Sequence, residues 1–339
     1  MRAITFKEKG EYEYRKAYPV PELGERDVLI DISQCGLCGT DVHIYKGEFE
    51  ADFPVVIGHE FSGTVEGVGE KVDNFEQGDR VAVNPNTVCN KCEFCRAGKE
   101  NLCVTLPGLG VNSDGGFAEY AKVPERCVYS IPDSVSFTSA AFVEPLSCAI
   151  NGINNASIEK GDDVLVLGSG PTGLLLVQLA NISGAAKVVS SAKRVKRLEM
   201  ARRLGATGTI NVTERNLKES VENLIGKSGA DVVIEAVGAE KTMKQSLQVV
   251  RPGGHVVWFG VASPELEIPI KPFEVYRKEL TIQGSFVNPY STKDALDLLA
   301  EGKIDVEDLV THRFGLEQFD RAIEVYSNDD SRIKIMMEP

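Results

Sequence analysis

Six residues near the middle of the chain, Gly168-Ser-Gly-Pro-Thr-Gly173, constrain its fold more than any other segment. The segment Asp163–Leu167 before them is predicted to be a buried strand, and the apolar run Leu174–Ala180 after them is predicted to be helical. A G-x-G-x-x-G turn that joins a strand to a helix is typical of a dinucleotide site, because the amides at the helix start face the pyrophosphate. The sequence therefore predicts a strand–turn–helix unit that binds a dinucleotide; a turn without a ligand is the alternative.

Each residue of this turn has an expected role. Gly168 permits the tight turn, Gly170 lets the backbone approach the pyrophosphate, and Gly173 allows the helix to pack closely on the strand. Pro171 and Thr172 stand between the second and third glycines of the motif. We expect these five residues to form the cofactor site.

Further strands alternate with helix-length segments after this turn. They are predicted at Lys187–Ser191, Asp231–Glu235, His255–Phe259 and Leu280–Gln283. Strand and helix in alternation predict a parallel, doubly wound sheet of the Rossmann type, and so an α/β protein.

The rest of the chain has a different pattern. Before about residue 151 it is rich in glycine, valine and short apolar runs such as Val28–Ile32 and Arg80–Val83, which predicts a β-rich domain. Two amphipathic helices are expected in the tail, at Thr292–Ala300 and Leu316–Tyr326.

The composition excludes several classes of protein. With 339 residues, 42% of them apolar and 26% charged, the chain has the length and make-up of a two- or three-domain globular protein. Its net charge of −13 argues against general nucleic-acid binding. The N-terminal residues lack the apolar core of a signal peptide, and no apolar run approaches the ~20 residues of a membrane helix. We expect a soluble, cytoplasmic protein whose partners include neither nucleic acid nor membrane.

Four of the eight cysteines lie within fifteen residues, with the spacing C-x2-C-x2-C-x7-C. They are Cys89, Cys92, Cys95 and Cys103. Neighbours so close do not easily form two unstrained disulfides, whereas four thiolates around one ion make a closed structural zinc site. An iron–sulfur cluster fits the last spacing poorly, and unrelated core cysteines are the remaining alternative. We predict one structural zinc ion here.

The end of the second strand bears on the choice of dinucleotide. NAD sites usually place an acidic residue there, about 20 residues beyond the glycines, but no acid occurs between Asp163 and Glu199. Ser191 stands near that position, and cations follow it at Lys193, Arg194, Lys196 and Arg197. A 2′-phosphate attracts such cations, so we expect NADP to be favoured, with NAD possible; a solvated basic helix face is the alternative.

A second motif, at residues 58–72, resembles the signature of a known enzyme family. The segment Gly58-His-Glu-x2-Gly63-x5-Gly69-x2-Val72 resembles the signature of zinc-dependent medium-chain alcohol dehydrogenases, and the cysteine cluster and glycine turn follow in that family's order. The resemblance covers essentially the whole chain. It implies a GroES-like catalytic domain at 1–151, with the structural zinc lobe at 84–106, a Rossmann domain at 152–286 and a tail at 287–339 that returns to the catalytic domain.

The resemblance also implies a catalytic zinc ion held by Cys38, His59 and a carboxylate, either Glu60 or Glu144. Three protein ligands leave one position open to the substrate oxygen, where zinc acts as a Lewis acid while hydride leaves for the nicotinamide. Thr40 and His43 match the hydroxyl and imidazole of the family's proton relay.

Two further expectations come from family position alone. Val261 and Ser285 are expected to border the nicotinamide. Related bacterial enzymes with the cysteine lobe are often tetramers, so we expect a homo-oligomer, tetramer or dimer.

The expected substrate is a small secondary alcohol. Glu144-Pro-Leu-Ser and Leu309–Phe314 resemble the polyol branch. This resemblance favours a vicinal diol or a sugar alcohol such as arabitol or sorbitol, oxidised to its ketose. Ile44 and the pair Val287-Asn288 depart from that branch's substrate contacts, and Cys38–Tyr45 equally resembles L-threonine 3-dehydrogenases. Threonine or a simple secondary alcohol therefore stands as the alternative.

Two other classes of protein with this fold do not need a catalytic zinc ion. A dinucleotide-binding sensor or structural protein would need no catalytic ligands, and zinc-free quinone reductases share the fold. Two zinc ions per chain would favour the dehydrogenase over both.

Overall fold

The computed structural model describes residues 1–339, and its internal contacts divide them into two compact units. The first unit comprises Met1–Ser147 together with Asn288–Pro339, and the second unit comprises Cys148–Val287. The chain passes from the first unit to the second within helix α4 (Val143–Ala156).

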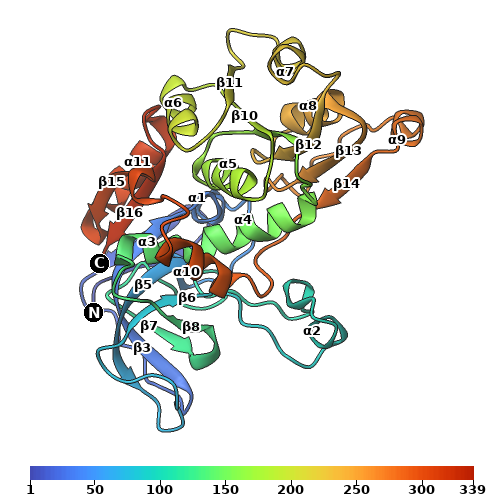
Figure 1. The fold of residues 1–339 in the computed structure, drawn as a ribbon. Helices are drawn as coiled ribbons and strands as arrows, with labels where there is room; N and C mark the ends of the chain where they lie inside the picture. Colours follow the sequence, from blue (N-terminus) through green and yellow to red (C-terminus); the bar gives the residue numbers. More distant parts are fainter. The chain divides into compact units, whose positions relative to one another are not determined.

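The second unit is built on a six-stranded parallel sheet in the order β11-β10-β9-β12-β13-β14 (Figure 1). The strands are β9 (Asp163–Leu167), β10 (Lys187–Ala192), β11 (Gly208–Asn211), β12 (Ala230–Glu235), β13 (Val250–Trp258) and β14 (Thr281–Gly284). Every residue of the central strands β9 and β12 is buried, as expected for a sheet covered on both faces. The strand order reverses between β9 and β12, and such switch points are where doubly wound sheets bind ligands.

Helices follow the strands of this sheet and cover it. They are α5 (Pro171–Ile182), α6 (Val195–Arg203), α7 (Leu217–Ile225), α8 (Glu240–Val249) and α9 (Pro272–Lys278). Helix α5 packs beside α6, and α7 packs beside α8. Because the connections run in opposite directions from β9 and β12, right-handed crossovers place these helix pairs on opposite faces. The predicted α/β Rossmann class is confirmed.

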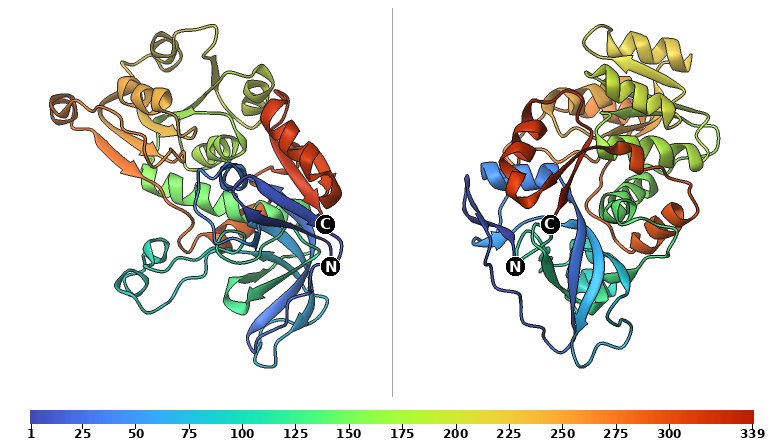
Figure 2. Two further views of the ribbon diagram at one scale, coloured as in Figure 1. Left: turned by 180° about the vertical axis from the view of Figure 1, so that it is seen from behind. Right: turned by 90° about the vertical axis from the view of Figure 1, so that its left-hand side faces the viewer.

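The first unit contains a seven-stranded sheet with the order β15-β16-β3-β5-β6-β8 and β7 paired to β3, and a three-stranded sheet β2-β1-β4. The strands are β1 (Ala3–Glu8), β2 (Glu11–Arg15), β3 (Asp27–Leu37), β4 (Val55–Val56), β5 (Glu60–Val68), β6 (Arg80–Val83), β7 (Tyr120–Pro124), β8 (Val128–Ser130), β15 (Val310–Gly315) and β16 (Lys334–Glu338). Strand β16 pairs with β3 in antiparallel fashion, so the end of the chain becomes part of the sheet that its beginning forms. Figure 2 shows the two termini near each other.

Aromatic packing fixes the tail of the first unit. Phe319 lies 5.9 Å from the ring of Phe6 and 5.6 Å from that of Phe117, and all three are fully buried. Helices of this unit are α1 (Gly39–Lys46), α2 (Glu93–Arg96), α3 (Phe137–Ala141), α10 (Thr292–Ala300) and α11 (Phe319–Asn328). Helix α10 has the predicted bounds, whereas α11 begins three residues later than predicted, after a short 3-10 turn at Leu316–Gln318. None of the helices combines the length and the apolar character that a membrane crossing requires.

Candidate active site

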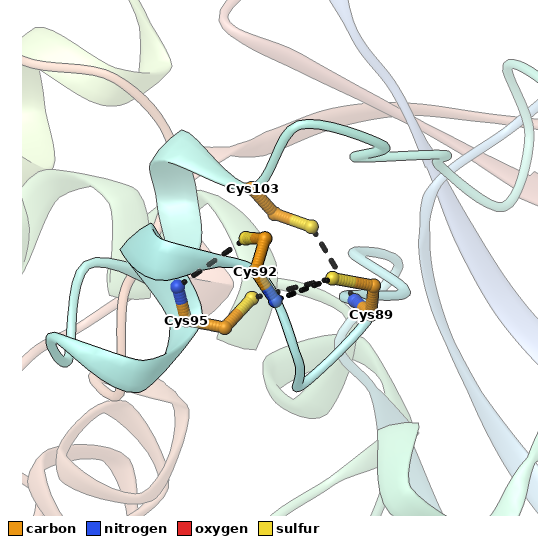
Figure 3. Close-up of side chains that lie close together, drawn as sticks. All are labelled: Cys89, Cys92, Cys95 and Cys103. Carbon is orange, nitrogen blue, oxygen red and sulfur yellow. Dashed lines mark hydrogen bonds between the residues drawn. The ribbon is translucent and has the colours of Figure 1, made fainter.

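The four clustered cysteines converge on one point of the first unit (Figure 3). The loop that carries them contains the single turn of α2, and all four sulfur atoms lie within 4.8 Å of one another. Cys89 Sγ and Cys95 Sγ are 3.9 Å apart. Sulfurs held at about 2.3 Å by a tetrahedral zinc ion stand about 3.8 Å from each other, so the arrangement fits zinc.

Backbone amides also prepare these sulfurs to hold a cation. The N–H of Cys89 donates to Cys103 Sγ at 3.3 Å and lowers the pKa of Cys103 to about 6. The N–H of Cys95 lowers the pKa of Cys92 in the same way, whereas burial raises the pKa of Cys95 to about 12. Four thiolates this close repel one another, so a bound cation is needed to keep all of them deprotonated.

A second group of possible metal ligands forms where β3 ends and β5 begins. Cys38 caps α1 directly after β3, and Glu60 is the first residue of β5, with His59 just before it. Because β3 and β5 are paired, these three residues meet, and their ligand atoms lie within 4.8 Å of one another. Sulfur, imidazole and carboxylate are the donors that zinc prefers, and three of them make an open site.

The buried carboxylate of Asp41 contacts both Cys38 and His59. Its carboxylate accepts a hydrogen bond from the N–H of Cys38 at 2.8 Å and lies 3.3 Å from His59 Nδ1. Burial opposes a charge on His59, but the Asp41 carboxylate and the Cys38 sulfur outweigh it and raise the pKa of His59 well above its usual range. A carboxylate behind a histidine is a common outer partner in zinc sites.

The charges around the group also fit a divalent cation. Asp41 and Glu60 are buried carboxylates, Cys38 adds a third negative charge as a thiolate, and buried Lys334 supplies one positive charge through its ion pair with Glu60. With Cys38 as a thiolate and His59 as a neutral imidazole, the states in which they bind a metal, the group has two uncompensated negative charges in a poorly solvated place. A divalent ion bound by Cys38 and His59 would neutralise them.

The other expected catalytic residues are not among these three gathered ligands. Glu144 lies in the first turn of α4, is half-buried, and does not belong to the three residues whose ligand atoms gather. Thr40 Oγ1 is 3.8 Å from Cys38 Sγ. His43, on the same helix α1, is partly exposed, and its Nδ1 is 2.6 Å from Glu48 Oε2.

In the second unit, the glycine turn has the geometry that its pattern predicts. Gly168 follows β9 with φ of 110°, a conformation that favours glycine, and Gly170 caps α5 with Pro171 as the first helical residue. A Cβ on Gly173 would overlap the carbonyl oxygen of Gly168, which explains the third glycine. Thr172 lies in the first turn of α5.

The basic segment follows the end of β10. Ser191 is buried within β10, Lys193 is exposed, and Arg194 caps α6. A Cβ on Gly170 would lie 4.0 Å from Nη1 of Arg197, so this guanidinium faces the glycine turn.

Val261 and Ser285 follow β13 and β14. Val261 is exposed, and Ser285 is half-buried, accepting a hydrogen bond from Asn151 Nδ2 at 3.3 Å.

Sequence reasoning missed two charged residues of the candidate metal centre, Asp41 and Lys334. Asp41 lies between Thr40 and His43 and became visible only through its contact with His59. Lys334 stands alone in the apolar run Ile333-Lys-Ile-Met-Met337, and an isolated charge in a buried strand is the signal that could have revealed it.

Comparisons with known proteins agree with this geometry. Residues 24–133 match the family model of the alcohol dehydrogenase GroES-like domain, and residues 171–301 match that of the zinc-binding dehydrogenases. The chain is 34% identical to D-arabinitol dehydrogenase 1 of Uromyces fabae, over 100% of this chain and 97% of that protein. It is 36% identical to sorbitol dehydrogenase of Halalkalibacterium halodurans, over 95% of this chain and 94% of that protein.

A solved structure shares the whole fold. It is a protein of Sinorhizobium meliloti that is described as a zinc-binding dehydrogenase and is bound to NADP. The two structures superpose with a TM-score of 0.95 at 36% sequence identity, over 100% of this chain and 99% of that chain. The chain therefore belongs to the zinc-dependent medium-chain alcohol dehydrogenase family, as the sequence resemblance predicted.

Proposed function

We propose that this protein oxidises a sugar alcohol, with arabitol and sorbitol as the leading substrates, to the ketose and transfers the hydride to NADP. The observation that carries this proposal is the open ligand group of Cys38, His59 and Glu60, in a chain that also carries a dinucleotide turn. Two similar proteins are named for arabinitol and sorbitol, which supports the substrate class.

Cys38 and His59 are the proposed constant ligands of the catalytic metal, with Glu60 or Glu144 as the third. Zinc, when bound, supplies Lewis acidity toward the hydroxyl oxygen of the alcohol. The Asp41 carboxylate faces His59 Nδ1 at 3.3 Å, which leaves Nε2 for the metal. We place the second, structural zinc ion in the lobe formed by Cys89, Cys92, Cys95 and Cys103.

Thr40 and His43 are the proposed path for the hydroxyl proton. The Thr40 hydroxyl lies beside Cys38, and His43 lies further along the same helix and is partly exposed to solvent. The Glu48 carboxylate lies 2.6 Å from Nδ1 and would hold the imidazole ring in place.

NADP is the proposed cofactor, with NAD as the alternative. The absence of an acid after β10, together with the cations Lys193, Arg194 and Arg197, supports recognition of a 2′-phosphate. Val261 and Ser285 are proposed to border the nicotinamide. Comparing kcat/KM for the two cofactors tests the preference, and equal or better efficiency with NAD would contradict it.

A substrate panel tests the substrate class. Arabitol, sorbitol, xylitol, butanediol and threonine are to be compared at matched zinc loading. We expect the highest kcat/KM with a polyol; no polyol turnover, with oxidation of threonine or butanediol, would replace the leading substrate with the alternative.

We further propose a cytoplasmic homo-oligomer, dimer or tetramer. The eight free cysteines, several of them in metal-ligating groups, support a reducing compartment. The edge strand β14 and nearby exposed apolar side chains support self-association through the second unit. These side chains are Ile270, Phe273, Tyr276 and Phe286.

A further inference from the structure

Lys334 is a buried lysine whose ammonium group reaches the metal centre. It is 3% exposed and forms an ion pair with Glu60, which is 1% exposed. The ring of Phe142 lies 5.7 Å from the ammonium nitrogen. Lysine is almost never buried so completely without a partner, so Glu60 is the group that makes this burial tolerable.

The backbone leaves space for this pair at one glycine. Gly36 of β3 lies opposite Glu60 of β5 on one side and opposite Met336 of β16 on the other. A Cβ at Gly36 would overlap the Glu60 carboxylate and lie 2.8 Å from Lys334 Cε. Three strands therefore cooperate to hold the two charges together.

The Glu60 carboxylate is therefore placed to interact with two cations, a bound metal ion and the Lys334 ammonium group. It is one of the three residues whose ligand atoms gather beside Cys38 and His59, and it is also the ion-pair partner of Lys334. An ammonium group that neutralises part of this carboxylate weakens its attraction for a divalent ion, and the two cations repel each other. The ammonium therefore opposes full bonding of Glu60 to the metal.

We propose that Lys334 is a positioning residue of the metal centre, which restrains Glu60 and so sets how firmly the ion beside Cys38 and His59 is held. This inference rests on the metal centre of the proposed function. Restraint of Glu60 also keeps a coordination position available for the substrate oxygen. Lys334 acts through Glu60 and has no role of its own in the chemical step.

Replacing the ammonium group tests this restraint. Lys334→Met keeps an unbranched side chain but removes the charge, so the buried Glu60 carboxylate then has only the metal to compensate it. We expect the zinc ion beside Cys38 to leave about tenfold more slowly, a change of the size typical for outer partners of metal ligands. Adding Glu60→Gln to this variant removes the released carboxylate and should reverse the effect.

The readout is zinc release into 4-(2-pyridylazo)resorcinol, followed by absorbance on the full chain. The cysteine lobe serves as an internal control, because its release phase should be the same in every variant, and a Cys38→Ser variant identifies which phase belongs to which ion. Lys122→Met, which changes an exposed lysine of β7, is the matched control. The cobalt-substituted protein gives a second readout: weaker visible absorbance in Lys334→Met would indicate an added carboxylate ligand.

The outcomes separate this inference from the proposed function. Two release phases in the unaltered chain, with the Cys38 phase slowed in Lys334→Met and restored in the double variant, support it. Unchanged or faster release in Lys334→Met overturns it, while the metal centre stands. If Lys334→Met does not fold, comparison of the uncharged double variant with Glu60→Gln decides: equal release rates support the inference, whereas clearly different rates show that Lys334 acts without Glu60 and overturn it. A single phase in the unaltered chain contradicts the proposed function itself.

Discussion

At the scale of single residues, the proposed metal centre brings several buried charges together. Asp41, Glu60 and Lys334 are all buried, and each is tolerated because another charge lies beside it. Loss of one member leaves the others uncompensated, so variants at these positions change both folding and metal binding. Partly exposed His43 is free of this coupling, which makes it the better probe of proton transfer.

We predict that His43→Gln lowers kcat by about tenfold or more, toward the hundredfold that general acid–base catalysis typically contributes. Glutamine keeps a polar side chain but does not take up a proton, so the dependence of kcat on pH should change. The measurement is kcat against pH. His312→Gln, at a histidine of β15 that pairs with Asp329, is the control; an unchanged profile for His43→Gln would remove it from the relay.

Arg197 is the residue through which cofactor choice is best tested. Because its guanidinium faces Gly170, we predict that Arg197→Ala weakens NADP binding by about tenfold, the equivalent of ~1.4 kcal/mol, and changes NAD binding far less. Titration calorimetry with both cofactors measures this. Arg202→Ala, at an exposed arginine in the last turn of the same helix, is the control. Equal loss for both cofactors would show that Arg197 does not recognise the 2′-phosphate.

At the scale of elements, strand β9 and helix α5 depend on their close approach at the glycine turn. The missing side chain of Gly173 lets the helix start against the carbonyl of Gly168, so the amides of α5 are presented at the switch point of the sheet. Packing of this kind tolerates little added volume.

We predict that Gly173→Ala destabilises the protein by about 1–3 kcal/mol and weakens binding of both dinucleotides alike, since the added methyl forces α5 away from β9. Urea unfolding and cofactor titration measure the two effects. Gly284→Ala serves as control, because nothing lies within 4 Å of its added Cβ. Stability equal to that of the control would show that the helix does not need this approach.

Much of the second unit could be predicted because its strands are local apolar runs. The predicted bounds of β9 are confirmed, and those of β10 and β12 differ by one residue each. Strand β11 was not predicted, since Gly208-Thr-Ile-Asn211 is too short and too polar to stand out.

The candidate site was predictable only where its residues share a motif. The cysteine lobe and the group around His59 follow from local spacing. The partners Glu60 and Lys334 are separated by 274 positions and meet only because β16 returns beside β3. Pairing of this kind is set by the fold, and no local pattern specifies it.

At the scale of the whole molecule, the chemistry is divided between two units of one chain. The first unit carries both cysteine-containing ligand groups, and the second carries the dinucleotide turn. The second unit also exposes apolar residues on α9 and the adjoining loop, with Phe273 64% and Tyr276 78% exposed. Side chains of this kind on a monomer usually mark a contact surface.

We predict that the combined change Phe273→Glu and Tyr276→Lys lowers the oligomeric state, because charges replace apolar contacts at the proposed subunit interface. Light scattering after size-exclusion chromatography measures the mass. Ile182→Lys, at another exposed apolar residue of the second unit, should leave it unchanged. An unchanged mass for the double variant would place the interface elsewhere.

The most direct test of the account is selective removal of the metal beside Cys38. Timed chelation, with zinc counted by plasma emission and folding followed by circular dichroism, should remove one zinc ion per chain before the second. We predict that turnover of the polyol falls in proportion to loss of the ion at Cys38 and returns when zinc is added back, while the cysteine lobe keeps its ion and the fold persists. Full turnover by a folded chain that has lost the ion at Cys38 would contradict the account.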